Sequence, residues 1–136
     1  MAQFEIKDGV AIVPKGTMTI RHRALSGCKE LQSVVIPESV LEIGKEAFSD
    51  CTSLESVVIP KGVRKIEERA FAGCTSLTTL TLPIGVNKIE ERVFYKCSAL
   101  AAINVPAGKA DYYKKRLPEE LHDKIVELAP EKKTKK

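Results

Sequence analysis

Four cysteines are the side chains in this sequence that could most readily bind a metal, form disulfides or act as nucleophiles. They recur every 23 residues, at Cys28, Cys51, Cys74 and Cys97. Zinc and redox sites usually hold two cysteines about two to four residues apart, and no such pair occurs here. Repeats stacked about 4.8 Å apart would bring the cysteine Cα atoms into disulfide range, but parallel Cβ vectors fit a disulfide poorly. We therefore predict four reduced thiols that face the core as small apolar groups.

The two histidines give little support for a catalytic site. His22 and His122 lie in distant parts of the chain, and we expect both on the surface with no nucleophile beside them. The sequence contains no phosphate-binding loop, dinucleotide fingerprint or zinc signature. We predict that the chain is not an enzyme and needs no metal or cofactor.

A group of glutamates on two neighbouring repeats could in principle attract a divalent cation. The group consists of Glu67, Glu68, Glu90 and Glu91. Because Arg69 and Arg92 directly follow the two glutamate pairs, we instead expect a solvated face of alternating ion pairs, each contributing about 0 to 1 kcal/mol.

The 23-residue interval extends well beyond the cysteines. It also links four leucines, four prolines, four isoleucines and a mainly aromatic series: Leu31, Leu54, Leu77, Leu100; Pro37, Pro60, Pro83, Pro106; Ile20, Ile43, Ile66, Ile89; Leu25, Phe48, Phe71, Phe94. A period of roughly 20 to 29 residues that starts Leu-x-x-Val-x-Ile is the signature of a leucine-rich repeat. One unit is too small to fold alone, so neighbouring units must stack to cover their apolar side chains.

The residue pattern within one unit predicts a strand, a second extended segment and a turn. Ser56 and Val58 should point outward from the strand, which a proline ends because it has no N–H to donate. The second piece is expected around Val63–Ile66, and a helical or 3₁₀ turn over Glu68–Cys74, with Gly73 ending it. The residues expected to point inward are Leu54, Val57, Ile59, Val63, Ile66, Ala70, Phe71 and Cys74.

The succession Leu-x-x-Val-x-Ile-Pro, Val-x-x-Ile, Ala-Phe-x-x-Cys resembles the BspA-like, or treponemal-type, leucine-rich repeats over roughly residues 9 to 113. The predicted fold is a β-rich leucine-rich-repeat solenoid: a right-handed superhelix of 23-residue repeats with two narrow parallel sheets, short helical turns and capped ends. The resemblance implies a cell-surface or secreted protein that acts in adhesion or binding of host proteins.

The ends depart from the repeat, as the caps of a solenoid should. We predict an N-terminal cap with an incomplete first repeat in residues 1–30, repeats in 31–105, a C-terminal cap in 106–129 and a disordered basic tail in 130–136. The first repeat should still contain a strand at Ala11–Pro14 and a second one at Ile20.

The C-terminal cap has two alternative predictions. The resemblance implies a short helix within residues 105–114 in place of the second strand. Lys124–Leu128 should then form a last strand over the end of the stack. Alternatively, a capping helix begins at Pro118, because four apolar residues follow helical spacing: Leu117, Leu121, Ile125 and Leu128.

Charge and hydropathy narrow the classes of partner. The net charge is +4, and the last six residues, with four Lys and one Glu, supply three of these charges. The nearly neutral remainder lacks the basic face of a nucleic-acid binder. No apolar stretch approaches the roughly 20 residues that cross a bilayer, and the first eight residues lack the regions of a signal peptide. We expect neither nucleic-acid binding nor membrane insertion, although the chain could be a trimmed piece of an exported protein.

The outward positions of the first strand of each repeat should line up into one surface, which we call the front strip. Its central row is Ile12, Val35, Val58, Thr81 and Asn104, and its flanking row is Val10, Ser33, Ser56, Thr79 and Ala102. Residues branched at Cβ favour strands in any case. An exposed apolar strip rimmed by Ser and Thr is nevertheless typical of protein-binding faces, so we predict that a monomeric chain binds a protein partner there. The alternatives are an intracellular scaffold, a spacer or a self-assembling structural protein.

Overall fold

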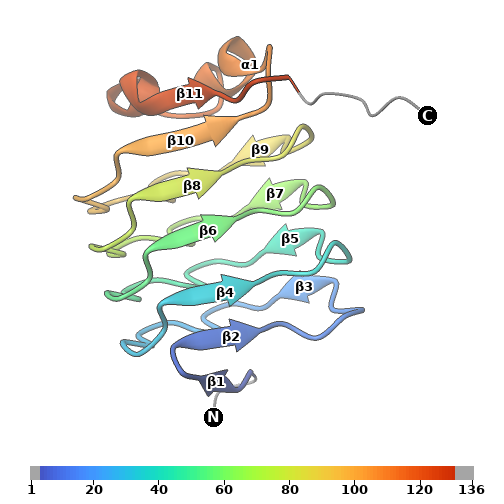
Figure 1. Ribbon diagram of the computed structural model, residues 1–136, viewed down its shortest axis with the longest axis vertical. Coiled ribbons are helices and arrows are strands. Elements are labelled where there is room, and N and C mark those ends of the chain that lie inside the picture. Colours follow the sequence, from blue (N-terminus) through green and yellow to red (C-terminus); the bar gives the residue numbers. More distant parts are fainter. Residues whose placement is uncertain (1–3, 131–136) are drawn as a thin grey trace.

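Stacked rungs, each with a front strand and a back strand, make up the computed structural model, which describes residues 4–130 (Figure 1). The front strands are β2 (Val10–Ile12), β4 (Ser33–Val35), β6 (Ser56–Val58), β8 (Thr79–Thr81) and β10 (Ala102–Val105). The back strands are β3 (Thr19–Ile20), β5 (Glu42–Ile43), β7 (Lys65–Ile66) and β9 (Lys88–Ile89). Of the tail predicted at 130–136, residues 131–136 lie outside the described residues. The predicted solenoid is confirmed.

Successive rungs pair in parallel with a register of one repeat. Val57 lies opposite Leu80 on the front, and Ile43 lies opposite Ile66 on the back. This register places equivalent side chains of successive repeats directly above one another, as the 23-residue period predicts.

The front strands differ from the prediction of a single continuous sheet. Pairing gives the orders β1-β2-β4 and β11-β10-β8-β6, so the ladder is interrupted between β4 and β6, although Figure 1 shows these strands side by side. Val34 and Ile36 of the β4 rung remain 8% exposed, whereas Val57 and Ile59 of the β6 rung are 2% exposed. The inward residues of the front strand are therefore less completely buried in the β4 rung than in the β6 rung.

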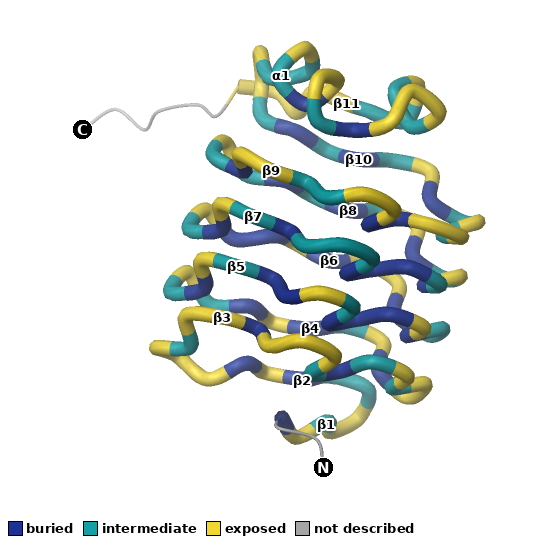
Figure 2. The backbone as a smooth tube through the Cα atoms, turned by 180° about the vertical axis from the view of Figure 1, so that it is seen from behind, coloured by how far each residue is buried: buried dark blue, intermediate teal, exposed yellow. Residues whose placement is uncertain are grey.

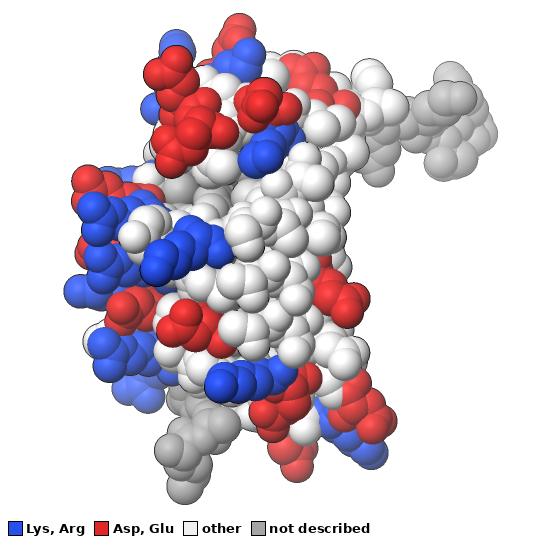
Figure 3. Space-filling model, turned by 90° about the vertical axis from the view of Figure 1, so that its left-hand side faces the viewer, with Lys and Arg blue, Asp and Glu red and all other residues white. Residues whose placement is uncertain are grey.

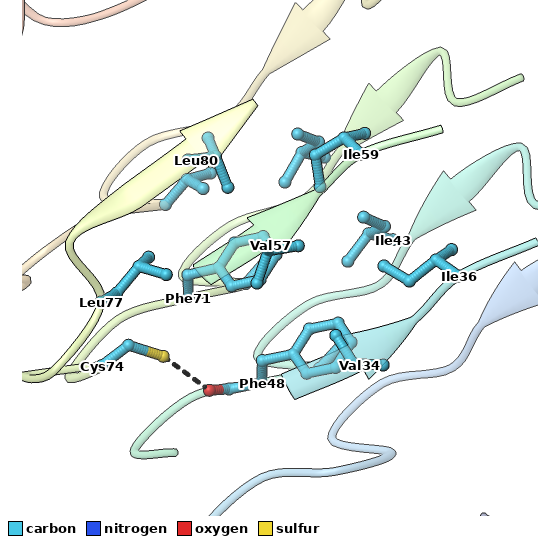
Figure 4. Packing of buried hydrophobic residues seen from close by; sticks show 14 of the residues in the cluster. Val34, Ile36, Ile43, Phe48, Val57, Ile59, Phe71, Cys74, Leu77 and Leu80 are labelled. Carbon is cyan, nitrogen blue, oxygen red and sulfur yellow. Dashed lines mark hydrogen bonds between the residues drawn. The ribbon is translucent and has the colours of Figure 1, made fainter. Parts of the chain in front are cut away.

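The core is a column of equivalent apolar side chains between the two sides of each rung (Figure 4). Figure 2 shows that buried residues recur along the backbone of successive rungs. All the inward residues predicted for the unit starting at Leu54 are at most 2% exposed, which confirms that prediction. The rings of Phe48 and Phe71 stack with centroids 5.1 Å apart, and those of Phe71 and Phe94 with centroids 5.9 Å apart. The register of the strands thus also places equivalent side chains in contact within the core.

The segment that returns from each back strand to the next front strand is a series of tight turns. In residues 67–74, Ala70, Ala72 and Cys74 each donate an N–H to the carbonyl three residues earlier. The residues between them, Arg69, Phe71 and Gly73, donate instead to the following rung, at 2.7–3.3 Å. The predicted helical turn is therefore reduced to separate i to i+3 turns, because every second N–H is used between rungs. We call the four such segments, 21–28, 44–51, 67–74 and 90–97, the turn column.

This alternation requires a left-handed backbone at two places in each turn of the column. One place holds Arg23, Glu46, Arg69 and Arg92, with φ of 58–59°. The other place holds Gly27, Asp50, Gly73 and Lys96, with φ of 58–78°. Only glycine adopts this region without steric cost. The non-glycine residues therefore carry strain that the bonds between rungs must offset.

Lys96 offers a direct test of that strain. We expect Lys96→Gly to be more stable than Lys96→Ala by about 1 kcal/mol, since both remove the side chain and only alanine keeps the Cβ clash at positive φ. The free energy of unfolding in urea measures the difference. A more stable alanine variant would mean that residue 96 is not left-handed in solution.

Both ends of the stack are capped by elements outside the repeat. At the N-terminus, β1 (Ile6–Lys7) pairs antiparallel with β2, a strand that the repeat pattern did not predict. At the C-terminus come a helix, α1 (Ala110–Lys114), and a 3₁₀ helix, η1 (Glu119–Lys124). The last strand, β11 (Ile125–Glu127), pairs parallel with β10.

The C-terminal cap follows the first of the two predictions. The short helix and the final strand are confirmed. A helix continuing from Pro118 to Leu128 is wrong, because η1 ends at Lys124 and the next residues are extended. Strand β11 gives the N–H and C=O groups at the free edge of β10 their partners, which a helix there could not do.

Tyr113 anchors the cap to the rung beneath it. Its ring is fully buried, its hydroxyl donates to the carbonyl of Pro83, and it accepts the N–H of Val86 at 3.3 Å. The neighbouring Tyr112 is half-buried, and its hydroxyl donates to the carbonyl of Val86 at 2.8 Å. The two tyrosines therefore fasten α1 to the turn after β8, one from inside the core and one from its edge.

Replacing Tyr113 by Phe should cost about 1–3 kcal/mol, because two main-chain groups, the N–H of Val86 and the carbonyl of Pro83, lose their partner. The matched change Tyr112→Phe should cost less, about 0.5–1 kcal/mol, because one main-chain group loses its partner and the Tyr112 side chain is itself half-buried. Urea unfolding of both variants tests the comparison. Equal losses would contradict a deeper anchoring role for Tyr113.

Candidate functional site

The front strip is aligned across the rungs as predicted. Ile12 lies opposite Val35, and Thr81 lies opposite both Val58 and Asn104 in the strand pairing. Ile12, Val35 and Val58 are 65%, 53% and 64% exposed, respectively, which is high for apolar side chains. The strip is therefore available to a partner over its whole apolar half.

The strip changes character along the stack. Thr81 and Asn104 are half-buried, and the Asn104 amide donates to the Thr81 hydroxyl at 3.4 Å. Of the flanking residues, Ser33 and Thr79 are half-buried and Ser56 is exposed. The half near the N-terminus thus offers hydrocarbon, and the half near the C-terminus offers groups that form hydrogen bonds.

The cap adds a residue to the strip that the sequence reasoning did not assign to it. Val126 of β11 lies opposite Asn104 and is 45% exposed. The signal was present in the predicted final strand, because Ile125 and Val126 alternate inward and outward as Ile103 and Asn104 do. An apolar side chain therefore follows the polar pair at the end of the strip.

The strip contains no charged residue, and charges gather elsewhere on the molecule. Figure 3 shows Lys, Arg, Asp and Glu side chains crowded along one flank, with a band of uncharged atoms beside them. An uncharged, β-branched surface gains free energy mainly by burial, at about 25 cal/mol for each Å² of apolar area. Chemically, the strip can dock an apolar surface, but it offers no group for acid–base catalysis.

The cysteines form a column, as predicted, but the thiols do more than fill space. Cys51 and Cys74 are fully buried, whereas Cys28 and Cys97 at the ends are half-buried. The thiols of Cys51, Cys74 and Cys97 each donate to a carbonyl of the preceding rung, at 3.0–3.1 Å. Figure 4 shows one of these bonds, from Cys74 to Phe48. Each thiol thus adds a hydrogen bond between neighbouring turns.

Burial also makes these thiols poor nucleophiles. It raises the pKa of Cys51 from its ordinary value of 9.0 to about 12 and that of Cys97 to about 11. The pKa of Cys74 is raised by the same cause. Because the thiolate is the reactive form, these cysteines are unsuited to catalysis.

We expect Cys28 to react first with a maleimide at pH 8 and Cys51 to react at least about 10-fold more slowly than in the unfolded chain, because burial raises its pKa and shields its sulfur. Mass spectrometry of labelled peptides gives the order. Unfolded protein without reductant should titrate four thiols. Fewer than four would show that a disulfide forms in the native protein.

The histidines do not lie beside a nucleophile in the part of the chain that the structure describes. His22 is exposed, as predicted, with its Nε2 3.7 Å from a carboxylate oxygen of Glu46. Arg23 donates to the same carboxylate at 2.7 Å and lowers the pKa of Glu46. The surface prediction for His122 is wrong in part, because it is half-buried and its Nε2 lies 3.0 Å from the carbonyl of Leu117. Both histidines thus make local structural contacts.

The glutamate group pairs with lysines and not with the predicted arginines. Glu68 lies 4.0 Å from Lys45, and Glu90 lies 3.9 Å from Lys65 and 3.6 Å from Lys88. Arg69 and Arg92 make no ion pair within residues 4–130, and Nε of Arg69 is buried there without a hydrogen-bond partner. The prediction of ion pairs is therefore confirmed for Glu68 and Glu90, with lysines of the same or a neighbouring rung as their partners.

Among residues 4–130, no three His, Cys, Asp or Glu side chains are placed to hold a metal ion. No helix within that range has the length and apolar character needed to cross a membrane.

A cleft opens between the last turn of the column and the C-terminal cap, and we call it the end cleft. Its volume is about 480 Å³, within the range of ligand pockets. One side is formed by residues 89–96 and the other by 115–118, Glu120 and Leu121. The repeat pattern could not predict the cleft, because the cleft arises where the cap does not continue the repeat.

Comparison with known proteins bears directly on the repeat. The family model described as the BspA type leucine-rich repeat region matches residues 10–115 in six copies. The chain belongs to this family. The resemblance seen in the sequence is confirmed, and a comparison with curated proteins finds no match.

Solved structures of leucine-rich repeat proteins are similar to this BspA-type chain. A leucine-rich cell surface protein from Faecalibacterium prausnitzii has 33% identity over 74% of this chain and 26% of its own, with a TM-score of 0.70. A leucine-rich repeat protein from Bacteroides ovatus has 32% identity over 88% of this chain and 30% of its own, with a TM-score of 0.71. The chain thus spans between a quarter and a third of these two proteins. The T. pallidum leucine-rich repeat protein shares the fold, with a TM-score of 0.57 and 24% identity over 76% of this chain and 68% of its own.

Proposed function

We propose that this chain is a non-catalytic protein-binding module whose front strip docks a partner protein in adhesion or partner recognition. The observation that carries the proposal is the alignment of three exposed apolar side chains, Ile12, Val35 and Val58, on successive front strands. Contiguous exposed apolar patches of this kind mark interaction sites in soluble proteins. The rigid spacing of rungs fixes the side chains in position, so little conformational entropy is lost when a partner binds.

Membership of the leucine-rich repeat family supports an interaction module, because repeat proteins bind through extended surfaces. The relative from F. prausnitzii is a cell surface protein, which supports a surface or secreted location for the protein that carries this module. The alternative is an intracellular scaffold or a spacer without its own ligand. Fractionation of the native full-length product separates the two locations.

The first test compares two variants with equal added charge. Val35→Asp with Val58→Asp places two carboxylates on the strip, whereas Leu41→Asp with Ile84→Asp places them at exposed apolar positions elsewhere. In pull-downs from candidate cell and extracellular extracts, we expect the wild type and the second variant to retain the same partner. The strip variant should lose it, because a docked partner would bury both carboxylates unpaired.

Circular dichroism and light scattering must first show that both variants are folded and share the wild-type oligomeric state. A strip variant that retains the partner as well as the wild type does would contradict the proposal. A mass that rises with concentration and falls in the strip variant would instead support self-assembly through this face.

A further inference from the structure

In the last turn of the column, three main-chain N–H groups have no acceptor within the described residues. In the three earlier turns, nine N–H groups at alternate residues donate to the next rung, as Arg69, Phe71 and Gly73 do. The equivalent groups of the last turn are the N–H of Arg92, Phe94 and Lys96, and none has an acceptor within residues 4–130. The cause is the cap, because α1 turns the chain away at the point where the next turn would begin.

These three donors belong to the wall of the end cleft, so the missing acceptors and the open space coincide. The arrangement is the exposed edge of a hydrogen-bonding array, because alternate residues of one turn pair with alternate residues of the next. As at an open sheet edge, unpaired main-chain groups of this array can pair with an added segment, here one with the turn backbone of residues 67–74. The cleft volume of about 480 Å³ leaves room for a short piece of peptide and not for a further domain.

The side chains around the donors favour an acceptor-rich ligand. Arg92 and Lys96 lie over the exposed ring of Tyr95, each 5.5 Å from its centroid. Lys115 faces them from the cap side of the cleft, and none of the three cations forms an ion pair within the described range. Of the three glutamates that line the cleft, Glu90 is already paired with two lysines. A fourth cation of the lining, Arg116, donates to the carbonyls of Asn87 and Tyr112. Three main-chain donors and three cations without such partners thus face two carboxylates that form no ion pair within the described range.

We propose that the end cleft binds a carboxylate-bearing peptide segment of a partner protein, with the turn backbone that the segments of the column adopt. Three alternate carbonyls of the peptide accept the N–H groups of Arg92, Phe94 and Lys96, and its acidic side chain lies among the basic residues. This site is separate from the front strip. The end cleft recognises the main chain of its ligand, whereas the front strip offers an apolar surface to side chains.

The chain itself indicates the sequence of a suitable peptide. The segments that accept from the earlier turns are Lys45–Ser49, Glu68–Ala72 and Glu91–Tyr95. Two of the three begin with glutamate, and the central acceptor is always small or β-branched: Ala47, Ala70 or Val93. We therefore choose the blocked peptide acetyl-Glu-Arg-Ala-Phe-Ala-amide, which copies residues 68–72. The matched control has D-Ala at its third position, where the copied residue Ala70 has a negative φ that a D-residue disfavours.

Amide hydrogen exchange by NMR tests the site without requiring a natural partner. In the free protein, the amides of Arg92, Phe94 and Lys96 should exchange at least about 100-fold faster than those of Arg69, Phe71 and Gly73. Saturating peptide should slow the three amides by at least about 10-fold, and the D-Ala peptide should not. Equal protection in the two turns of the free protein would overturn the proposal.

Two variants separate charge from fold and this site from the strip. Lys96→Glu with Lys115→Glu changes exposed side chains only and should weaken peptide binding by about 10-fold or more. Val35→Asp with Val58→Asp should leave peptide binding unchanged, so the two proposed sites can fail independently. No shift of the three amides at millimolar peptide would overturn the proposal. Protection that appears with rising protein concentration, together with a rising mass in sedimentation, would also overturn it by showing that a second copy fills the cleft.

Discussion

The structure depends on a hydrogen-bonding register of one repeat between successive rungs. Each rung offers donors upward and acceptors downward at the same positions, in the strands and in the turn column alike. A single rung could satisfy neither set, and its apolar face would remain in water. The stability of such an array is approximately a sum over neighbouring pairs of rungs. A residue that recurs every 23 positions therefore makes the same stabilising contact in each pair.

That register explains which expectations from the sequence were accurate. Phe48, Phe71 and Phe94 must stack, and the cysteines must form a column, because any residue that recurs at the period has its counterpart directly above it. The final strand was predictable for a related reason, since the alternation of Ile125 and Val126 matches the edge it covers. The residues of the front strip could be named from sequence because their outward direction follows from strand parity alone.

Features that break the period were not predictable. Strand β1 lies outside the repeat, and the short η1 helix stands where helical spacing suggested a longer one. The left-handed backbone at Glu46 and Lys96 was also hidden, because both residues are ordinary helix formers by propensity and are held there by bonds between rungs. Likewise, the gap in the ladder between β4 and β6 has no counterpart in the repeat, since both units carry Ser-Val-Val in those strands.

The two ends of the array are chemically opposite, and this polarity bears on where binding can occur. The first turn exposes carbonyls at His22, Ala24 and Ser26 that no described group engages, whereas the last turn exposes the three N–H groups of the end cleft. A cap that continued the register would satisfy those donors, but the helix α1 anchored by Tyr113 cannot do so. The anchoring that closes the core beneath the cap therefore also leaves the donor edge open. An N–H group that is open to solvent can exchange a hydrogen bond with water for one with a peptide carbonyl at little cost. The end of a solenoid can therefore bind main chain while its front face binds side chains.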